Sequence, residues 1–179
     1  MEEDCMVLGL PSIMGELCFV DDTICFLDAA QAQRFFKDEE NTFQSSSAIS
    51  LDALGLDGRT GIYKAIVSPE RDYFVSLYTE DSEENLYAYL PYGEKNTVFS
   101  LDCRINYMEF SSDGRIFAVD IFGTVYEIDP MTESAKKLFD TKGNLGAFDI
   151  ANGYLTVLDE EELFFYSLTE NALVETPKS

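Results

Sequence analysis

Short runs of apolar residues that alternate with polar ones recur along the whole chain. The stretch INYMEFSSDGRIFAVDIFGTVYEIDPMTESAKKLF, residues 105–139, contains four of them. It predicts strands at residues 105–110, 115–120, 124–128 and 135–139, separated by turns at Ser-Ser-Asp-Gly, Phe-Gly and Asp-Pro-Met-Thr. Helical periodicity is poor almost everywhere, so the pattern predicts an all-β fold.

The same four-strand unit returns on both sides of this stretch, at approximately residues 62–99 and 146–176. The predicted third strands begin near Leu86, Val125 and Leu163, so the spacing, by subtraction, is 39 and then 38 residues. A shorter first copy at approximately residues 5–36 is assembled from strands at 6–10, 17–20, 23–27 and 33–36. Residues 37–61 are serine-rich at first and break the period, so we expect a long connection there.

Two segments of the copy at 105–139 resemble known repeats. FSSDGRIFAVD resembles the turn between the first and second strands of WD-repeat and TolB-type blades, and GTVYEIDPMT resembles their third strand and the turn after it. The chain has no Trp and no His, so it departs from the WD-repeat motif and is closer to TolB, YVTN or quinoprotein-like repeats. The resemblance implies a β-propeller-like domain over residues 1–179, with about four antiparallel four-stranded blades.

Four blades are the lower limit for a closed propeller, so three arrangements fit the repeats. The chain is part of a larger propeller, or a self-contained four-bladed ring or open stack, or one half of a ring that a second chain completes. Repeats that do not close leave sheet edges and apolar faces exposed, which favours self-association through open edges.

Charge and composition exclude several classes of function. The formal net charge is −22, from 34 acidic and 12 basic residues, which argues against nucleic acid and anionic membrane surfaces as partners. Histidine is absent, so no Ser-His, Cys-His or His-ligated metal mechanism is available. No apolar run is long enough to span a bilayer and no basic-then-apolar leader opens the chain. We expect a soluble protein, either cytoplasmic or secreted with its leader removed.

The stretch ELCFVDDTICFLD, residues 16–28, predicts a hairpin with a cysteine on each strand. If Asp21 and Asp22 form a two-residue turn, Cys18 lies directly opposite Cys25, close enough for a disulfide. Two buried free thiols are the favoured interpretation, because free cysteine is among the most buried residue types. There is no Cys-x-x-Cys pair, and GLDGRTG at 55–61 lacks the Gly-Lys-Ser/Thr ending of a phosphate loop, so no metal or cofactor is expected.

The candidate interaction surface is aromatic. It consists of Tyr87, Tyr89, Tyr92, Phe164 and Tyr166, residue types that are enriched at interfaces. The alternative, which we favour, is that these side chains pack between blades. Acidic clusters at 38–40, 80–84 and 159–162 could supply paired carboxylates for glycoside hydrolysis, but they fall at predicted turns, where solvated charge is the simpler explanation.

The sequence therefore predicts a non-enzymatic binding module with an unidentified protein or small-ligand partner. Two alternatives stay open: a structural or sensor domain of a bacterial surface or solute-binding protein, and a carboxylate-dependent, glycosidase-like fragment. We assign no catalytic, cofactor-binding or metal-binding residue.

Overall fold

The fold is described from a computed structural model of the chain. The described residues are 16–20, 23–27, 31–37, 43–50, 54, 56, 60–70, 72–79, 84–91, 94–142, 145–160 and 162–174. For the first four strands the description concerns the backbone. Within these ranges, no helix is long and apolar enough to cross a membrane.

The strands form four antiparallel sheets, each with its strands in sequence order. The first sheet contains β1 (Glu16–Val20), β2 (Thr23–Leu27), β3 (Gln31–Lys37) and β4 (Phe43–Ser50). The second contains β5 (Thr60–Val67), β6 (Tyr73–Thr79), β7 (Asn85–Leu90) and β8 (Thr97–Leu101). The third contains β9 (Ile105–Phe110), β10 (Ile116–Asp120), β11 (Thr124–Asp129) and β12 (Ser134–Asp140). The fourth contains β13 (Leu145–Ala151), β14 (Tyr154–Asp159), β15 (Leu163–Ser167) and β16 (Ala172–Val174).

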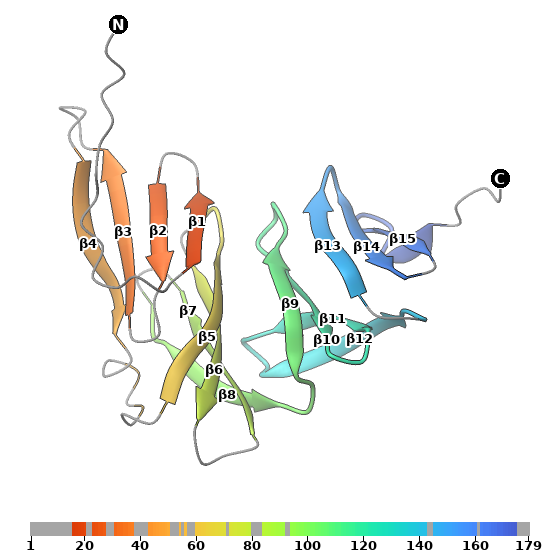
Figure 1. The fold of residues 1–179 in the computed structure, drawn as a ribbon, viewed down its shortest axis with the longest axis horizontal. Coiled ribbons are helices and arrows are strands. Elements are labelled where there is room, and N and C mark those ends of the chain that lie inside the picture. The colour runs from red at the N-terminus through yellow and green to blue at the C-terminus, as the bar shows by residue number, and fades with distance from the viewer. Residues whose placement is uncertain are drawn as a thin grey trace, which may run out of the picture.

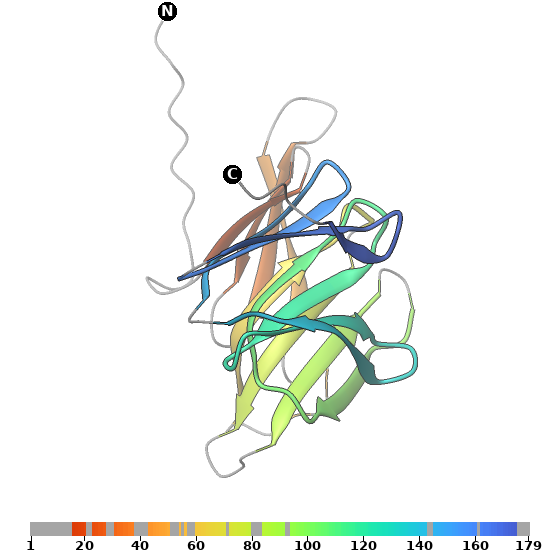
Figure 2. The same cartoon turned by 90° about the vertical axis from the view of Figure 1, so that its right-hand side faces the viewer.

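The four sheets follow one another along an open arc (Figure 1). The first strands β1, β5, β9 and β13 contact one another in this order and lie on the inner side of the arc. The first and fourth sheets stand at its two ends. Figure 2 looks along the arc from the end where the fourth sheet lies, so that the fourth sheet is in front. The predicted all-β fold of four-stranded repeats is confirmed.

The first repeat differs from the prediction. Its first strand is residues 16–20 and its fourth is Phe43–Ser50, inside the segment that the sequence predicted to be a connection over 37–61. The predicted strand at 6–10 lies outside the described residues. The serine-rich β4 escaped the prediction because it is an outermost strand that pairs with β3 through its backbone, and such pairing does not require an apolar sequence.

The predicted turns between first and second strands carry a recurring serine. Ser68 and Ser111 each donate their backbone N–H to the carbonyl four residues later, at 2.8 Å, and each hydroxyl accepts the backbone N–H of that same residue. In the second of these turns Gly114 has a φ of 80°, a conformation that favours glycine. The turn residues singled out in the sequence therefore connect the strands as expected.

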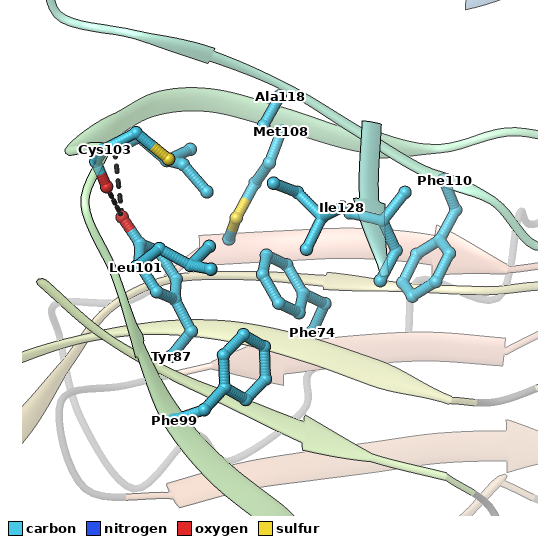
Figure 3. Packing of buried hydrophobic residues seen from close by; sticks show 11 residues of the cluster. Phe74, Tyr87, Phe99, Leu101, Cys103, Met108, Phe110, Ala118 and Ile128 are labelled. Atoms are coloured by element: carbon cyan, nitrogen blue, oxygen red, sulfur yellow. Dashed lines mark hydrogen bonds between the residues drawn. The ribbon is translucent and has the colours of Figure 1, made fainter. Parts of the chain in front are cut away.

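Three apolar clusters hold the described sheets together. One covers the face of the second sheet that carries Ala65, Val75 and Ala88, another lies between the second and third sheets, and the last lies between the third and fourth. Both faces of each middle sheet are therefore buried. In the cluster between the second and third sheets, Phe74 stacks on Tyr87 with ring centroids 5.6 Å apart (Figure 3).

The Tyr87 hydroxyl fixes the crossover from the second sheet to the third (Figure 3). It donates a hydrogen bond to the carbonyl oxygen of Cys103 and accepts one from the backbone N–H of Ile105, both at 2.9 Å. Burial is the main reason why the pKa of Tyr87 rises to about 12. The hydroxyl therefore stays protonated and serves both backbone groups at any physiological pH.

Two polar side chains of the third sheet tie it to the fourth. The guanidinium of Arg115 donates to the carbonyl oxygen of Leu168 at 2.9 Å and to Asn171 Oδ1 at 3.1 Å. Glu109 on β9 accepts a hydrogen bond from the backbone N–H of Ile150 on β13 at 3.1 Å. Burial, and then the nearby charge of Asp149, raise the pKa of Glu109 to about 7.

We expect Tyr87→Phe to lower the free energy of unfolding by about 1 to 3 kcal/mol, because it leaves a buried N–H and a buried carbonyl without a partner. Denaturant unfolding measures the change. Tyr89→Phe is the matched control: it removes a partly exposed hydrogen bond to Asp72 and should cost less. Equal losses in the two variants would contradict the role given to the Tyr87 hydroxyl.

We expect Glu109→Gln to remove a pH dependence of stability. A carboxyl whose pKa is raised on folding binds more protons in the folded state, so stability falls as pH rises from about 4.5 to about 7. The variant keeps an acceptor for the backbone N–H of Ile150. Between pH 5 and pH 8 its free energy of unfolding should rise by about 1 to 2 kcal/mol relative to that of the native chain. This gain is smaller than the full pKa shift implies, because solvent screens part of the side chain.

The measurement is denaturant unfolding of both proteins across that pH range. Asp149→Asn is the companion variant. It removes the second cause of the raised pKa of Glu109, the charge of Asp149. The pH range over which stability changes should therefore become narrower without disappearing. Parallel stability profiles for the native chain and Glu109→Gln would show that Glu109 titrates as an ordinary surface carboxyl.

Candidate functional site

A groove of about 500 Å³ lies where the third sheet meets the third strand of the second sheet. The turns β9–β10 and β11–β12 bring its walls together, and β7 contributes one aromatic side chain. Its lining combines apolar, aromatic and charged groups: Tyr89, Gly114, Arg115, Ile116, Glu127, Ile128, Asp129, Pro130, Met131, Ser134 and Lys136. This mixture suits a ligand that offers both apolar and polar groups.

Tyr89 forms the wall that belongs to the second sheet. Its hydroxyl donates to Asp72 Oδ2 at 3.0 Å, which fixes the ring against the turn before β6. Burial comes first among the causes that raise the pKa of Tyr89 to about 12, and the hydrogen bond to Asp72 comes second. Tyr89 therefore presents an uncharged, oriented aromatic ring to the groove.

The charges of the groove are largely paired with one another. Arg115 lies 3.0 Å from Asp113 and 3.6 Å from Glu127, measured between guanidinium nitrogen and carboxylate oxygen. Lys136 Nζ is 4.0 Å from the other carboxylate oxygen of Glu127, and its side chain is 70% exposed. Two cations therefore line this groove, in a chain that carries only 12 basic residues.

Met131 stands exposed at the outer rim. The backbone N–H groups of Met131 and Thr132 both donate to Asp129 Oδ1, at 2.9 and 3.3 Å. Hydrogen bonding, from Thr132 first, lowers the pKa of Asp129, so the turn keeps its ionised cap at neutral pH. Met131 is 74% exposed on this turn, whose backbone the hydrogen bonds to Asp129 fix. An exposed, adaptable apolar side chain on a fixed backbone suits protein contact.

A second exposed apolar feature lies at the opposite end of the third sheet, in the turn between β10 and β11. Phe122 is 82% exposed and Ile121 is exposed beside it. The buried Asp120 fixes this turn, since its Oδ1 accepts the backbone N–H groups of Phe122 and Thr124 at 2.8 and 2.9 Å and its Oδ2 accepts the Tyr126 hydroxyl at 3.1 Å. The turn thus presents two large apolar side chains in a fixed geometry.

Reactive groups of two kinds, metal ligands and thiols, can be placed within the described residues. Among them, no three Cys, Asp or Glu side chains are grouped so that they could hold a metal ion. The thiol of Cys103 is buried, and burial raises its pKa to about 11, which leaves it protonated at neutral pH.

The aromatic residues that the sequence singled out do not share one surface. Tyr87 and Tyr166 are buried between sheets, and the half-buried Phe164 packs on Phe139 with ring centroids 5.8 Å apart. These three side chains therefore pack between blades, which was the alternative to an interaction surface. Tyr89 reaches the groove. Tyr92 lies outside the described residues.

The structure bears on two further predictions, the hairpin register and the acidic turns. Cys18 pairs with Cys25 in the β1–β2 register, as predicted, whereas the choice between disulfide and thiols concerns side chains outside the description. Asp159 is not a solvated turn residue: it is buried and accepts the backbone N–H groups of Glu162 and Lys142 at 2.7 and 2.8 Å. It caps its turn as Asp120 does one repeat earlier. Glu84 is exposed, and the cluster at 38–40 lies outside the described residues.

Sequence reasoning missed the exposed residues Met131 and Phe122. A signal was present for both, because each is a large apolar residue inside a segment predicted to be a turn, where small and polar residues are usual. The groove itself could not be read from the sequence, since Tyr89 and Lys136 come from different repeats.

The chain is similar to known proteins in fold but not in sequence. No family model matches the chain. No curated protein matches it in sequence. Many solved structures match its fold. The chain is similar to apo AztD from Citrobacter koseri, with 8% identity and a TM-score of 0.65 over 89% of this chain and 45% of that one.

Two further structures are similar at 14% identity and a TM-score of 0.56. One is YCF48 bound to D1 peptide, matched over 93% of this chain and 55% of that one. The other is the Neurospora crassa Pan2 WD40 domain, matched over 89% and 50%. The chain thus spans about half the length of these propeller-type structures. The four-stranded antiparallel sheets, their succession along an arc and these matches lead to one conclusion: the chain has a β-propeller-type fold.

Proposed function

We propose that the chain is a non-enzymatic binding module that holds an extended segment of a partner protein in the groove between the second and third sheets. The observation that carries the proposal is the lining of this groove. Exposed Met131 and the oriented ring of Tyr89 offer apolar contacts, while Arg115, Glu127 and Lys136 lie close enough to one another to offer charged contacts of both signs.

An extended peptide matches this lining better than a compact ligand does. The polar groups that line the groove are spread over β7, β11, β12 and the turn before β10 rather than directed at one point. A peptide can place an apolar side chain against Met131 and use its backbone for the polar contacts. The similar structure of YCF48 is bound to a peptide, which supports the same class of ligand for this propeller-type fold.

A catalytic role fits the described residues less well. Glu109 has the strongly raised pKa that an acid catalyst needs, but one of its oxygens accepts the N–H of Ile150 and joins two inner strands. The carboxylate of Asp120 accepts hydrogen bonds from the Tyr126 hydroxyl and from the backbone. The carboxylate of Asp159 accepts a backbone N–H within its turn. These carboxylates act in structural hydrogen bonds, and so a binding role is the one we propose.

The test is selection of random peptides displayed on phage against the immobilised chain, followed by fluorescence anisotropy with the selected peptides. Met131→Lys should weaken binding by tenfold or more, which corresponds to about 1.4 kcal/mol. Lys136→Glu should change the affinity for those peptides that carry charge. Thermal unfolding of each variant checks that the fold is kept.

Phe122→Lys is the matched control, because it replaces a more exposed apolar residue at the other end of the same sheet and should leave peptide affinity unchanged. Failure to select any peptide, or selected peptides that bind Met131→Lys as tightly as the native chain, would refute the groove as the binding site.

A further inference from the structure

The outer face of the fourth sheet is apolar and exposed. Strand pairing sets Thr156 opposite Phe165 and Leu158 opposite Leu163, and it sets Val174 beside Phe165, so these side chains share one face. Leu158 is 42% exposed and Leu163 is 44% exposed. The opposite face carries Leu155, Val157 and Tyr166 and packs on the third sheet. Among the residues that the structure describes, the fourth sheet therefore has apolar side chains on both faces and a neighbouring sheet on one.

The repeat shows what this face is built to contact. In the third sheet the equivalent positions are Phe117, Val119 and Val125, each 0% exposed because the fourth sheet covers them. Residues one repeat later, 39, 39 and 38 positions along the chain, are Thr156, Leu158 and Leu163. This face thus occupies the place where the second and third sheets each receive the next one, and a four-stranded sheet of the same kind is the shape that fits it.

We propose that this face receives the first sheet of a second copy of the chain, so that two chains close one ring of eight blades. Each chain ends its arc with the uncovered fourth sheet at one end and the first sheet, β1–β4, at the other (Figure 1). A head-to-tail contact closes after two copies when each copy supplies four of the eight blades. Eight blades lie within the usual range for propellers, and the similar solved chains are about twice as long as this one.

The net charge of the chain predicts that added salt strengthens the proposed dimer. Each copy carries a net charge of −22, so two copies repel one another at long range. The described outer face contributes a single carboxylate, that of Asp149, and is otherwise uncharged. Salt screens the repulsion and leaves the apolar contact in place, so the dimer should tighten as salt is added.

The experiment is light scattering of the purified 179-residue chain at two concentrations and at low and high salt. The native chain should have twice the single-chain mass of 20.2 kDa at high salt. Leu158→Lys combined with Leu163→Lys should weaken the dimer at least tenfold and give the single-chain mass. Lysine lowers the net negative charge, so its effect could not come from added repulsion. Circular dichroism and thermal unfolding verify that the variant is folded.

Phe122→Lys is the control, because it introduces a lysine at an exposed apolar residue outside the proposed interface and should stay dimeric. Tyr154→Lys, on the same face as Leu158, is the second variant should the double one fail to fold. A native chain of single-chain mass in all conditions, a dimer that survives substitution of this face, or a mass that grows beyond two chains would overturn the closed ring. The proposal concerns a surface separate from the groove, so each can fail without the other.

Discussion

The second and third sheets each depend on the sheet after them, because each carries apolar side chains on both faces. Phe74 and Tyr87 point from the second sheet toward the third, while Val75 and Ala88, their neighbours along the same strands, point the other way. A sheet with two apolar faces is not stable in water on its own, and stacking is what removes those faces from solvent. The arc and its two distinct ends are consequences of that constraint.

Hydrogen bonds at the junctions decide how the stacked sheets are aligned. The Tyr87 hydroxyl holds the backbone on both sides of the crossover to the third sheet, and Arg115 and Glu109 join the third sheet to the fourth. Apolar contact is non-directional, so these bonds add the geometry that packing alone lacks. The groove depends on this alignment, since its Tyr89 wall belongs to one sheet and its Arg115 and Met131 walls to the next.

The acidic surface and the exposed apolar groups have complementary effects. A net charge of −22 opposes indiscriminate association, so that apolar side chains such as Met131 and Phe122 can remain exposed. Buried carboxylates serve a different purpose. Asp120 and Asp159, one repeat apart, accept backbone N–H groups in equivalent turns. The repeat therefore conserves turn chemistry as well as the apolar pattern within this one chain.

The sequence by itself determined the strand pattern, the repeat spacing, the serine turns and the pairing of Cys18 with Cys25, because alternation and turn chemistry are local properties. It misplaced the first repeat, since the polar β4 is held by backbone pairing, and it could not distinguish the buried Tyr87 from the groove-facing Tyr89. Both tyrosines lie on one strand with the same alternation. Only the tertiary structure decided between them, because exposure depends on where a neighbouring sheet, distant in sequence, ends.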